Sequence, residues 1–313
     1  MYFPVAGIEV SPWVPPLVAM VVSFFTSMGG VSGAFLLLPF QMSFLGYTAP
    51  SVSATNHLFN IVAIPSGVIR YLREGRMVWP LTWIVVAGTL PGVLIGAVVR
   101  VTWLPDADSF KLFAAAVLLY IGIKMVRDLT GKAKGSGKAE SERRFQELVR
   151  EHRSRAGEDR TLPAVRTIAF NWKRTCYEFY GERYDVSTPG IFALSFVVGI
   201  IGGTYGIGGG SIVAPFFVTV FGLPVYTVAG AALMGTFVTS VAGVAFYQFL
   251  APFHPDLAVA PDWLLGILFG LGGMVGMYLG ARCQKHVPAP VIKWMLTVIV
   301  LGTALKYGYS SLF

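Results

Sequence analysis

The sequence predicts an all-α membrane protein with two homologous four-segment halves of inverted topology, each beginning with a glycine-broken re-entrant helical hairpin. Three observations predict this fold class: the composition, a series of eight apolar segments and an internal repeat. Of the 313 residues, 55% are hydrophobic and 13% are charged, and the mean hydropathy is +0.66. A soluble domain carries about a quarter charged residues because its surface faces water. The composition therefore excludes an ordinary soluble protein, a disordered chain and a small disulfide-stabilised domain.

The charged residues are concentrated in the middle of the chain. Residues 128–189 hold 13 of the 24 Lys and Arg and 10 of the 16 Asp and Glu. They divide the chain into a first transmembrane half (1–127), a cytoplasmic linker (128–189) and a second transmembrane half (190–313). Within the linker, the pattern predicts an amphipathic helix around 145–152 and an interfacial helix around 172–180. The mixed charges of the linker argue against a nucleic-acid-binding tail.

Eight segments are apolar over about 20 residues, the length that crosses a bilayer core of about 30 Å. They span residues 15–45, 51–69, 78–99, 110–126, 190–222, 226–251, 262–281 and 291–307. The first and the fifth are too long for one crossing, because a straight helix of that length would measure about 46–50 Å. Each is also interrupted by a glycine-rich stretch, at 29–33 and at 202–210. We therefore expect two half-helices folded into a hairpin in each; a single long, tilted and kinked helix is the alternative.

The two halves repeat the same glycine and proline positions. One constant shift along the chain superposes Gly30 on Gly206, Gly33 on Gly209, Pro39 on Pro215 and Gly46 on Gly222. A second, slightly longer shift superposes Gly88, Gly92 and Gly96 on Gly272, Gly276 and Gly280. Chance rarely keeps so many glycines and prolines in step, so the chain is an internal duplication. The rows of glycines at every fourth position predict close packing between helices.

The loop charges predict how the segments are oriented. With hairpins in segments one and five, Arg70–Arg76, the linker and Arg282 fall on one side, whereas Glu9, Asp106 and Asp256 fall on the other. The positive-inside rule assigns the basic side to the cytoplasm. This arrangement predicts a multi-pass protein of the cell (inner) membrane, with a cytoplasmic linker and with halves inverted relative to each other. Inverted repeats with interrupted helices are typical of secondary transporters, which bind substrate near the midplane.

A glycine-rich break before a helix leaves backbone N–H groups and the positive end of a helix dipole at the break. That arrangement favours an anion. The candidate substrate-binding residues at the two breaks are Ser32, Gly33, Gly208, Gly209, Gly210 and Ser211. Because a helix dipole contributes only about 1–2 kcal/mol, further hydrogen bonds must complete such a site. The alternative is that these glycines only permit close packing.

Polar side chains on two apolar segments could supply those hydrogen bonds. The candidates are Ser53, Asn56, His57 and Asn60 on the second segment and Thr236 and Ser240 on the sixth. The first four are spaced so that they share one helical face. Polar groups on a membrane helix are costly unless they line a cavity or a helix contact. For the Ser and Thr hydroxyls, a hydrogen bond back to the backbone of their own helix is the alternative.

His57 is the only ionisable side chain deep within an apolar segment, and no Asp or Glu lies that deep. A carboxylate proton relay is therefore excluded, and in proton-coupled transport His57 or the substrate itself would carry the proton. A structural histidine is the alternative. The glycine run 206–210 lacks the Lys-Ser/Thr that follows in a nucleotide-binding loop, and we expect neither a cofactor nor a metal site.

The motifs of both halves point to a known family. They are Gly206–Gly210, Pro215, Gly222 and the small residues 228–240 in the second half, and Gly29–Gly30, Gly33, Pro39, Gly46 and Ala54–Asn56 in the first. In these motifs the chain resembles the TauE/SafE family of sulfite and sulfonate exporters. The resemblance implies a plasma-membrane exporter of small sulfur oxyanions or organosulfonates in a bacterium or archaeon, without enzymatic activity. The chain departs from the family pattern at Val31 and Ser32, where glycines are common, and in its longer linker.

Two functions are weighed. The first is a secondary transporter, an exporter of small sulfur-containing anions such as sulfite or organosulfonates, working by alternating access around a midplane site. The alternative is a non-transporting membrane scaffold or assembly factor that acts through the cytoplasmic linker. An intramembrane enzyme is disfavoured because the sequence carries no recognisable protease or nucleophile motif. The expected partners are the anion and the lipid bilayer, and not nucleic acid; protons as coupling ion and a homo-oligomer stay open.

Overall fold

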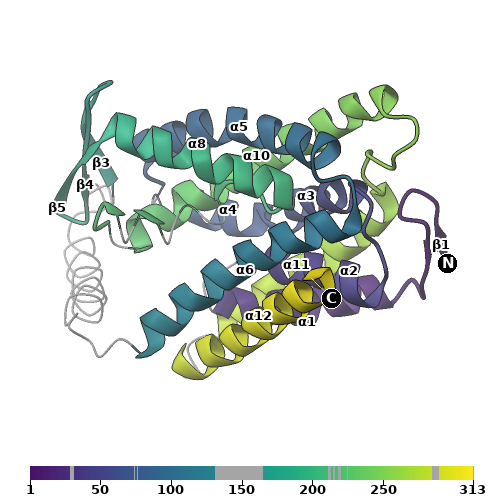
Figure 1. The fold of residues 1–313 in the computed structure, drawn as a ribbon. Helices are drawn as coiled ribbons and strands as arrows, with labels where there is room; N and C mark the ends of the chain where they lie inside the picture. Colours follow the sequence, from purple (N-terminus) through teal and green to yellow (C-terminus); the bar gives the residue numbers. More distant parts are fainter. Residues whose placement is uncertain are drawn as a thin grey trace.

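The computed structural model (Figure 1) describes most of the two halves and the last part of the linker. The described residues are 1–28, 32–73, 75, 77–130, 165–210, 213, 216–217, 220–223, 225–283 and 289–312. The helices are α1 (Val14–Met28), α2 (Ala34–Phe44), α3 (Ser51–Ala63), α4 (Pro65–Arg73), α5 (Trp79–Thr102), α6 (Ala107–Thr130), α8 (Thr188–Tyr205), α10 (Val225–Leu250), the short 3-10 helix η1 (Ala251–Phe253), α11 (Trp263–Cys283) and α12 (Ala289–Leu312). The strands are β1 (Tyr2–Phe3), β2 (Ile8–Glu9), β3 (Val165–Phe170), β4 (Arg174–Phe179) and β5 (Glu182–Ser187).

Within the described residues, six helical stretches are long and apolar enough to cross a membrane. They are Ser51–Arg73, Trp79–Thr102, Ala107–Arg127, Thr188–Tyr205, Thr227–Phe253 and Trp263–Gly280. Two shorter apolar helices, α1 and α2, flank the break in the first segment. The structure therefore confirms a mostly helical protein with several candidate membrane-crossing segments.

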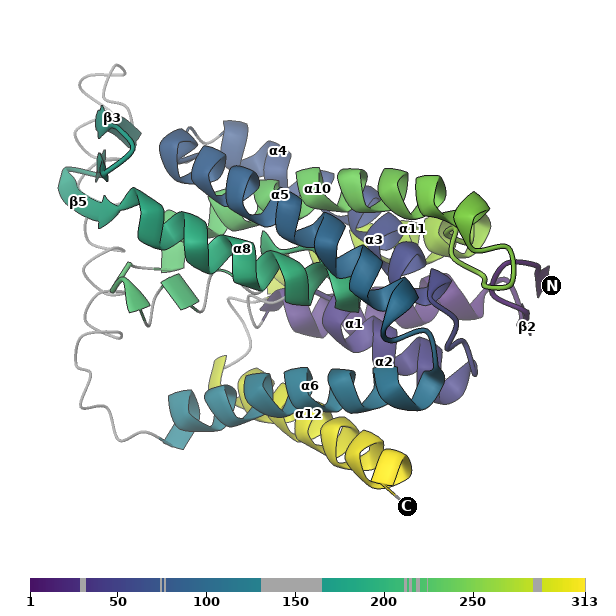
Figure 2. The same ribbon diagram turned by 45° about the horizontal axis from the view of Figure 1, so that its top comes forward.

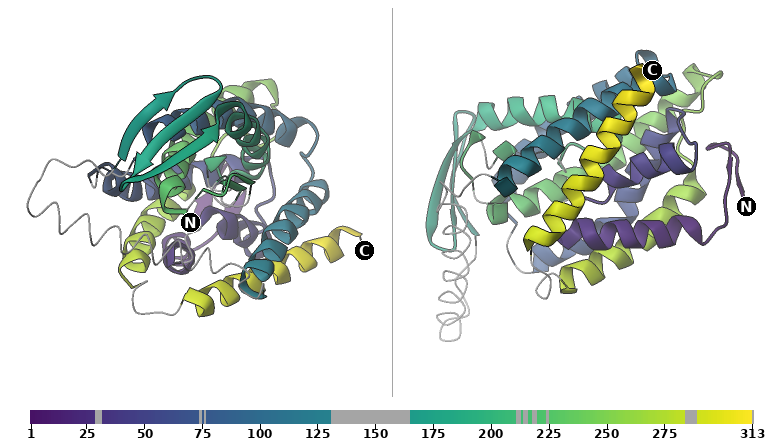
Figure 3. Two further views of the ribbon diagram at one scale, coloured as in Figure 1. Left: turned by 90° about the vertical axis from the view of Figure 1, so that its left-hand side faces the viewer. Right: turned by 60° about the horizontal axis from the view of Figure 1, so that its bottom comes forward.

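The helices run between two ends of the molecule, and each end carries a small sheet. At one end β1 and β2 pair close to the N-terminus, and at the other β3, β4 and β5 form an antiparallel sheet (Figures 1 and 3). We call these the N-terminal end and the sheet end.

Both ends of the first broken segment lie at the N-terminal end. Ahead of α1, the backbone N–H of Ala6 donates to Asp262 Oδ2 over 3.3 Å. After α2, the Tyr47 hydroxyl bonds to Thr55 Oγ1 over 2.9 Å, and Thr55 Oγ1 accepts from the backbone N–H of Asp262, also over 2.9 Å. A single residue, Asp262, thus connects the chain before α1 with the chain after α2.

Both ends of the fifth segment lie at the sheet end. Helix α8 begins directly after β5, where the Ser187 hydroxyl accepts from the backbone N–H of Gly190. A Cβ added at Gly190 would lie 3.1 Å from the Phe221 ring, so the chain returns to the start of α8 after the break. At the far end of α8, Gly206 adopts the left-handed conformation, with φ +82°, that ends a helix. Helices α1 and α8 therefore begin at opposite ends of the molecule (Figure 2).

The two predicted glycine rows bring helices into backbone contact. On α5, a Cβ at Gly92 would collide with the Phe196 carbonyl of α8. On α11, a Cβ at Gly276 would collide with the Met20 carbonyl of α1. The predicted role of these glycines in close packing is confirmed. Each row packs against the broken segment of the other half.

Residues 165–187 form an antiparallel sheet, and not the interfacial helix that we expected around 172–180. The alternation along β4 explains the difference, because Tyr177 and Phe179 lie two residues apart and are both buried on one face. The all-α prediction is therefore wrong for this part of the linker. The amphipathic helix expected around 145–152 lies outside the described residues.

The turns of this sheet also have recognisable causes in the sequence. Between β3 and β4, Asn171 Oδ1 accepts from the backbone N–H groups of Lys173 and Arg174, over 3.0 and 2.7 Å, which forms a local turn. Between β4 and β5, Tyr180 and Gly181 have φ of 49° and 86°. Two consecutive residues with positive φ are what a two-residue hairpin turn requires.

Candidate functional site

The two glycine breaks approach each other beside helix α3, in the centre of the molecule. Asn56 Nδ2 donates to the carbonyl of Ala34 at the start of α2, over 2.9 Å. One turn further on, Asn60 Nδ2 donates to the carbonyl of Ile207 in the second break, over 3.1 Å. Both asparagines are fully buried. Because two asparagines of one helix bind both breaks, α3 fixes the breaks relative to each other.

Most of the predicted site residues gather at this point. We call them the central cluster: Ser32, Ser53, Asn56, His57, Asn60, Gly208, Gly210, Thr236 and Ser240. They come from the residues before α2, from α3, from the break after α8 and from α10. All are buried except Ser32, which is partly exposed. Four separate stretches of the sequence therefore contribute to one polar site inside an apolar protein.

The hydroxyls of the cluster bind the broken backbone. The Ser32 hydroxyl accepts from the backbone N–H of Ala34 and donates to Asn60 Oδ1, each over 3.3 Å. The Ser53 hydroxyl donates to the carbonyl of Thr204 near the end of α8, over 3.0 Å. A helix end leaves carbonyl and N–H groups without helical partners. In this arrangement Ser32 satisfies the N–H of Ala34 at the start of α2, and Ser53 satisfies the carbonyl of Thr204 at the end of α8.

His57 joins the two halves. Its Nδ1 lies 3.3 Å from the Ser240 hydroxyl of α10, and its ring centroid lies 6.1 Å from that of Tyr247 on the same helix. A Cβ added at Gly243 would lie 3.0 Å from the imidazole Cδ2, so this glycine makes room for the ring. His57 Nε2 has no hydrogen-bond partner among the described residues.

The glycines of the second break face different helices. A Cβ at Gly208, whose φ is +72°, would lie 2.9 Å from Thr236 Cγ2 and 3.0 Å from the Ser240 hydroxyl. A Cβ at Gly210 would collide with α10 as well, 2.6 Å from the backbone nitrogen of Thr236. Gly209 instead faces α5, where a Cβ would lie 2.6 Å from Thr89 Cγ2. Gly208 and Gly210 therefore belong to the cluster by contact, and Gly209 packs outside it.

Two further predicted residues stand apart from these contacts. Gly33 is the residue before α2, and a Cβ there would lie 2.7 Å from the Ser23 hydroxyl of α1. Ser211 lies outside the described residues. On α10, the Thr236 hydroxyl donates to the carbonyl four residues earlier, over 2.9 Å, as the back-bonding alternative expected.

The cluster and its surroundings retain polar atoms with no hydrogen-bond partner in the described part of the chain. They are Asn56 Oδ1, His57 Nε2 and, from α1, the Ser23 hydroxyl. A buried polar atom without a partner costs about 1–3 kcal/mol. Each unpartnered buried group in a native structure calls for an explanation, and these three atoms are the hydrogen-bonding groups of the cluster that a polar ligand could satisfy.

Sequence reasoning missed several buried polar residues. Tyr205, Tyr247 and Ser23 contact the breaks or the cluster, and Arg100 lies inside α5 because that helix continues to Thr102, beyond our segment limit of residue 99. Tyr247 could have been found, since it lies seven residues after Ser240 and so on the same helical face. Tyr205 stands directly before the glycine run, and only its contacts reveal its role.

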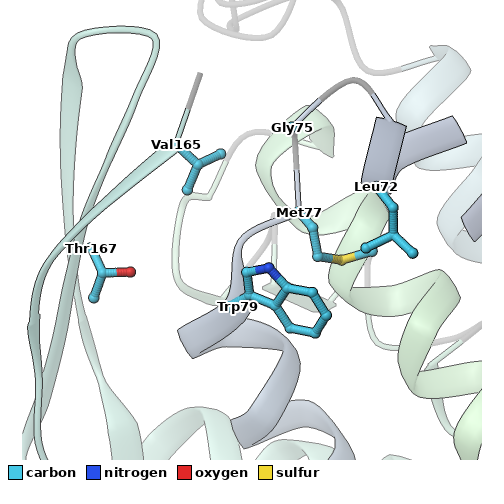
Figure 4. A pocket seen from close by; sticks show the side chains of 6 residues that line it. All are labelled: Leu72, Gly75, Met77, Trp79, Val165 and Thr167. Atoms are coloured by element: carbon cyan, nitrogen blue, oxygen red, sulfur yellow. The ribbon is translucent and has the colours of Figure 1, made fainter. Parts of the chain in front are cut away.

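A separate pocket of about 230 Å³ opens at the sheet end (Figure 4). Its lining residues are Leu72, Gly75, Met77, Trp79, Val165 and Thr167. It lies between the α4–α5 connection and β3 and contains no residue of the central cluster. Among the described residues, no group of three His, Cys, Asp or Glu could hold a metal ion.

Comparison with known proteins agrees with this architecture. The family model for sulfite exporter TauE/SafE matches residues 16–307. The chain is 22% identical over 294 residues to the probable membrane transporter protein YunE of Bacillus subtilis (strain 168), covering 92% of this chain and 93% of that protein. It is 25% identical over 127 residues to the probable membrane transporter protein ORF9 of Sinorhizobium sp, covering 40% of this chain and 46% of that protein. No solved structure gives a significant match. The chain belongs to the sulfite exporter TauE/SafE family of membrane transporters.

Proposed function

We propose that the protein is a secondary transporter that exports small sulfur-containing anions, such as sulfite or organosulfonates, by alternating access around the central cluster. One observation carries this proposal: two broken segments extend from opposite ends and meet at a buried polar cluster with unpartnered atoms. Transporters with inverted repeats bind substrate at such a junction of broken helices, near the midplane. The family model adds the chemical class of the substrate.

In this proposal the two broken segments are re-entrant hairpins and the sheet end faces the cytoplasm. Charge supports the orientation. Described cations at or near the sheet end are Arg73, Arg127, Arg166, Lys173, Arg174 and Arg183. Acidic residues at the N-terminal end are Glu9, Asp106, Asp108, Asp256 and Asp262. Basic loops remain in the cytoplasm during insertion, so the linker is cytoplasmic and the N-terminal end faces outward.

The anion would bind at the N-terminus of α2, where the Ser23 hydroxyl lies beside Gly33. The Ser23 hydroxyl supplies a donor that no described residue occupies, and the Nε2–H of a neutral His57 supplies another within the central cluster. The start of α2 adds the positive end of its dipole. The other cluster residues, Asn56 and Asn60 above all, hold the breaks in register through their bonds to Ala34 and Ile207. Binding and positioning thus fall to different side chains.

Flux of ³⁵S-labelled sulfite into proteoliposomes tests the function. Wild type should show saturable flux, and Ser23→Ala and Asn60→Ala should reduce it at least tenfold, the first through lost binding and the second through a displaced break. Ser66→Ala is the matched control, because Ser66 lies on α4 and donates only to the carbonyl of Ala63 in the chain just before it. Thiosulfate and methanesulfonate are assayed in parallel to identify the preferred anion.

The outcomes separate the two functions. Flux of one of these anions that falls in Ser23→Ala and persists in Ser66→Ala supports transport through the central cluster. Folded protein that moves none of the three contradicts the transporter proposal and favours a scaffold that acts through the linker.

A further inference from the structure

A buried arginine of α5 lies beside the turn between α2 and α3, towards the N-terminal end. Arg100 is fully buried, and its guanidinium carbon lies 3.8 Å from the centroid of the Phe110 ring. Nη2 donates to the Thr48 carbonyl over 2.8 Å, and Nη1 donates to the Leu104 carbonyl. The remaining Nε has no hydrogen-bond partner among the described residues.

Among the described residues, no ion pair neutralises the charge of Arg100. Two carbonyls solvate the guanidinium but carry only partial charges. No described carboxylate lies within 4.0 Å of it, because the described ion pairs are Lys111–Asp108 and Arg174–Asp185. Asp106 is near enough for its charge to act on Arg100, yet it is exposed at the surface. A buried cation without a partner is costly and is stabilised by a bound anion.

A second buried group close to the turn between α2 and α3 also lacks partners. Gln41, on α2, is fully buried, and neither its amide nitrogen nor its amide oxygen has a hydrogen-bond partner in the described part of the chain. The Gln41 backbone carbonyl accepts from the N–H of Tyr47 over 3.0 Å. Tyr47 directly precedes Thr48, whose carbonyl Arg100 binds. Gln41 and Arg100 therefore approach the same turn, between α2 and α3.

Tyr47 completes this group. Its hydroxyl is buried and lies within reach of the charge of Arg100, and burial raises its pKa, so the hydroxyl stays neutral and able to donate. We call Gln41, Tyr47 and Arg100 the outer cluster. Together they offer an amide, a hydroxyl and a guanidinium N–H, which are the donors that bind oxyanions in proteins.

The outer cluster adjoins the central cluster on the side of the N-terminal end. Tyr47 bonds to Thr55, the residue before Asn56. Tyr247, whose ring lies 6.1 Å from that of His57, is also within reach of the charge of Arg100. Polar groups therefore continue from the central cluster to Arg100 through buried tyrosines.

We propose that the outer cluster is a second oxyanion site, which binds the exported anion after it leaves the central cluster and before it reaches the outer solution. This inference rests on the proposed function, because it takes the N-terminal end as the outward side. An arginine that served only to tie the α2–α3 turn to α5 would explain its two carbonyl bonds. It would explain neither the unpartnered Nε nor the unpartnered amide of Gln41 at the same turn.

Equilibrium binding of ³⁵S-labelled sulfite to the purified, full-length protein tests the proposal. Wild type should bind two anions per chain. Arg100→Gln and Gln41→Met should each weaken the second site at least about tenfold, as expected for losing a hydrogen bond to a charged ligand. Lys111→Gln is the matched control, since it removes the same charge at the same end of the molecule from a residue that pairs with Asp108; it should leave both sites intact.

Thermal unfolding separates binding from folding. Gln41→Met keeps the length of the side chain and removes a buried amide without partners, so its melting temperature should equal or exceed that of wild type while its second site is lost. Wild type that binds one anion, with unchanged affinity in Arg100→Gln and Gln41→Met, overturns the second site and leaves the proposed function standing. Folded wild type that binds no sulfite, thiosulfate or methanesulfonate overturns both.

Discussion

The Tyr205 hydroxyl donates a 3.0 Å hydrogen bond to the carbonyl of Phe35. Pro39 lies four residues after Phe35 within α2 and has no N–H to give that carbonyl its helical bond. Tyr205 is the last residue of α8, so the bond joins the second broken segment to the first. Both residues are buried. A motion that moves the two glycine-rich breaks apart must disrupt this hydrogen bond. The bond survives only if α2 and α8 move together.

Tyr205→Phe removes this bond and keeps the ring. The Phe35 carbonyl then stays buried without its partner, and we expect a loss of about 1 kcal/mol in stability. The measurement is the thermal unfolding midpoint in detergent, together with anion flux at the same protein density. Tyr2→Phe, on an exposed tyrosine at the N-terminal end, is the control and should leave both unchanged. Equal midpoints for Tyr205→Phe and wild type would show that the bond does not stabilise the contact between the segments.

The glycine rows predict the same effect for equivalent alanine substitutions in the two halves. A Cβ at Gly92 would meet the Phe196 carbonyl, and a Cβ at Gly276 would meet the Met20 carbonyl. Since backbone cannot yield as a side chain can, Gly92→Ala and Gly276→Ala should each lower the yield of folded protein and its unfolding midpoint by several degrees. In Gly302→Ala, nothing lies within 4 Å of the new Cβ, and alanine favours the helix. A midpoint for Gly302→Ala as low as for the other two would contradict the packing argument.

These contacts show what the sequence could predict. Glycines at every fourth position of an apolar segment have few uses besides close packing. The repeat that superposes Gly92 on Gly276 also relates their contacts, because the shift that places Gly30 on Gly206 places Met20 on Phe196. Apolar length likewise predicted the second, third, fourth, sixth and seventh segments to within a few residues of the candidate spans. The glycine rows and the apolar segments depend on the spacing of residues along the chain, which can be read directly from the sequence.

Other features depend on which partner a group meets in three dimensions. Asn56 and Asn60 were expected to face an anion, and they bind the carbonyls of Ala34 and Ile207 instead. Spacing predicts that two amides share a helical face, but it does not say whether a ligand or a broken backbone lies opposite. Arg100 was missed for a similar reason, because its burial depends on the turn whose carbonyls it binds.

His57 leads to a prediction about coupling. An ordinary histidine titrates near pH 6.5, and in this protein Nε2 has no described partner while Nδ1 contacts Ser240. If His57 carries the coupling proton, His57→Gln should keep measurable sulfite flux and lose its dependence on a pH gradient. His254→Gln, in the loop after η1, is the matched control and should respond to the gradient as wild type does. A gradient response that survives in His57→Gln assigns the proton to the substrate and leaves His57 a structural role.

The inverted arrangement predicts opposite labelling of two equivalent positions. Gly46 and Gly222 are superposed by the internal repeat, follow the two broken segments, and have open space where a Cβ would lie. In a chain with Cys176 and Cys283 replaced by serine, Gly46→Cys should react with a membrane-impermeant maleimide from the outside of intact cells. Gly222→Cys should react only after the membrane is opened, because the chain after the second break returns to the sheet end, where Gly190 faces Phe221. Both positions have positive φ, so cysteine strains each turn by a similar amount, about 1 kcal/mol, and neither variant is favoured by folding. Labelling of both positions from the same side would contradict the inverted topology and, with it, the outward assignment of Arg100.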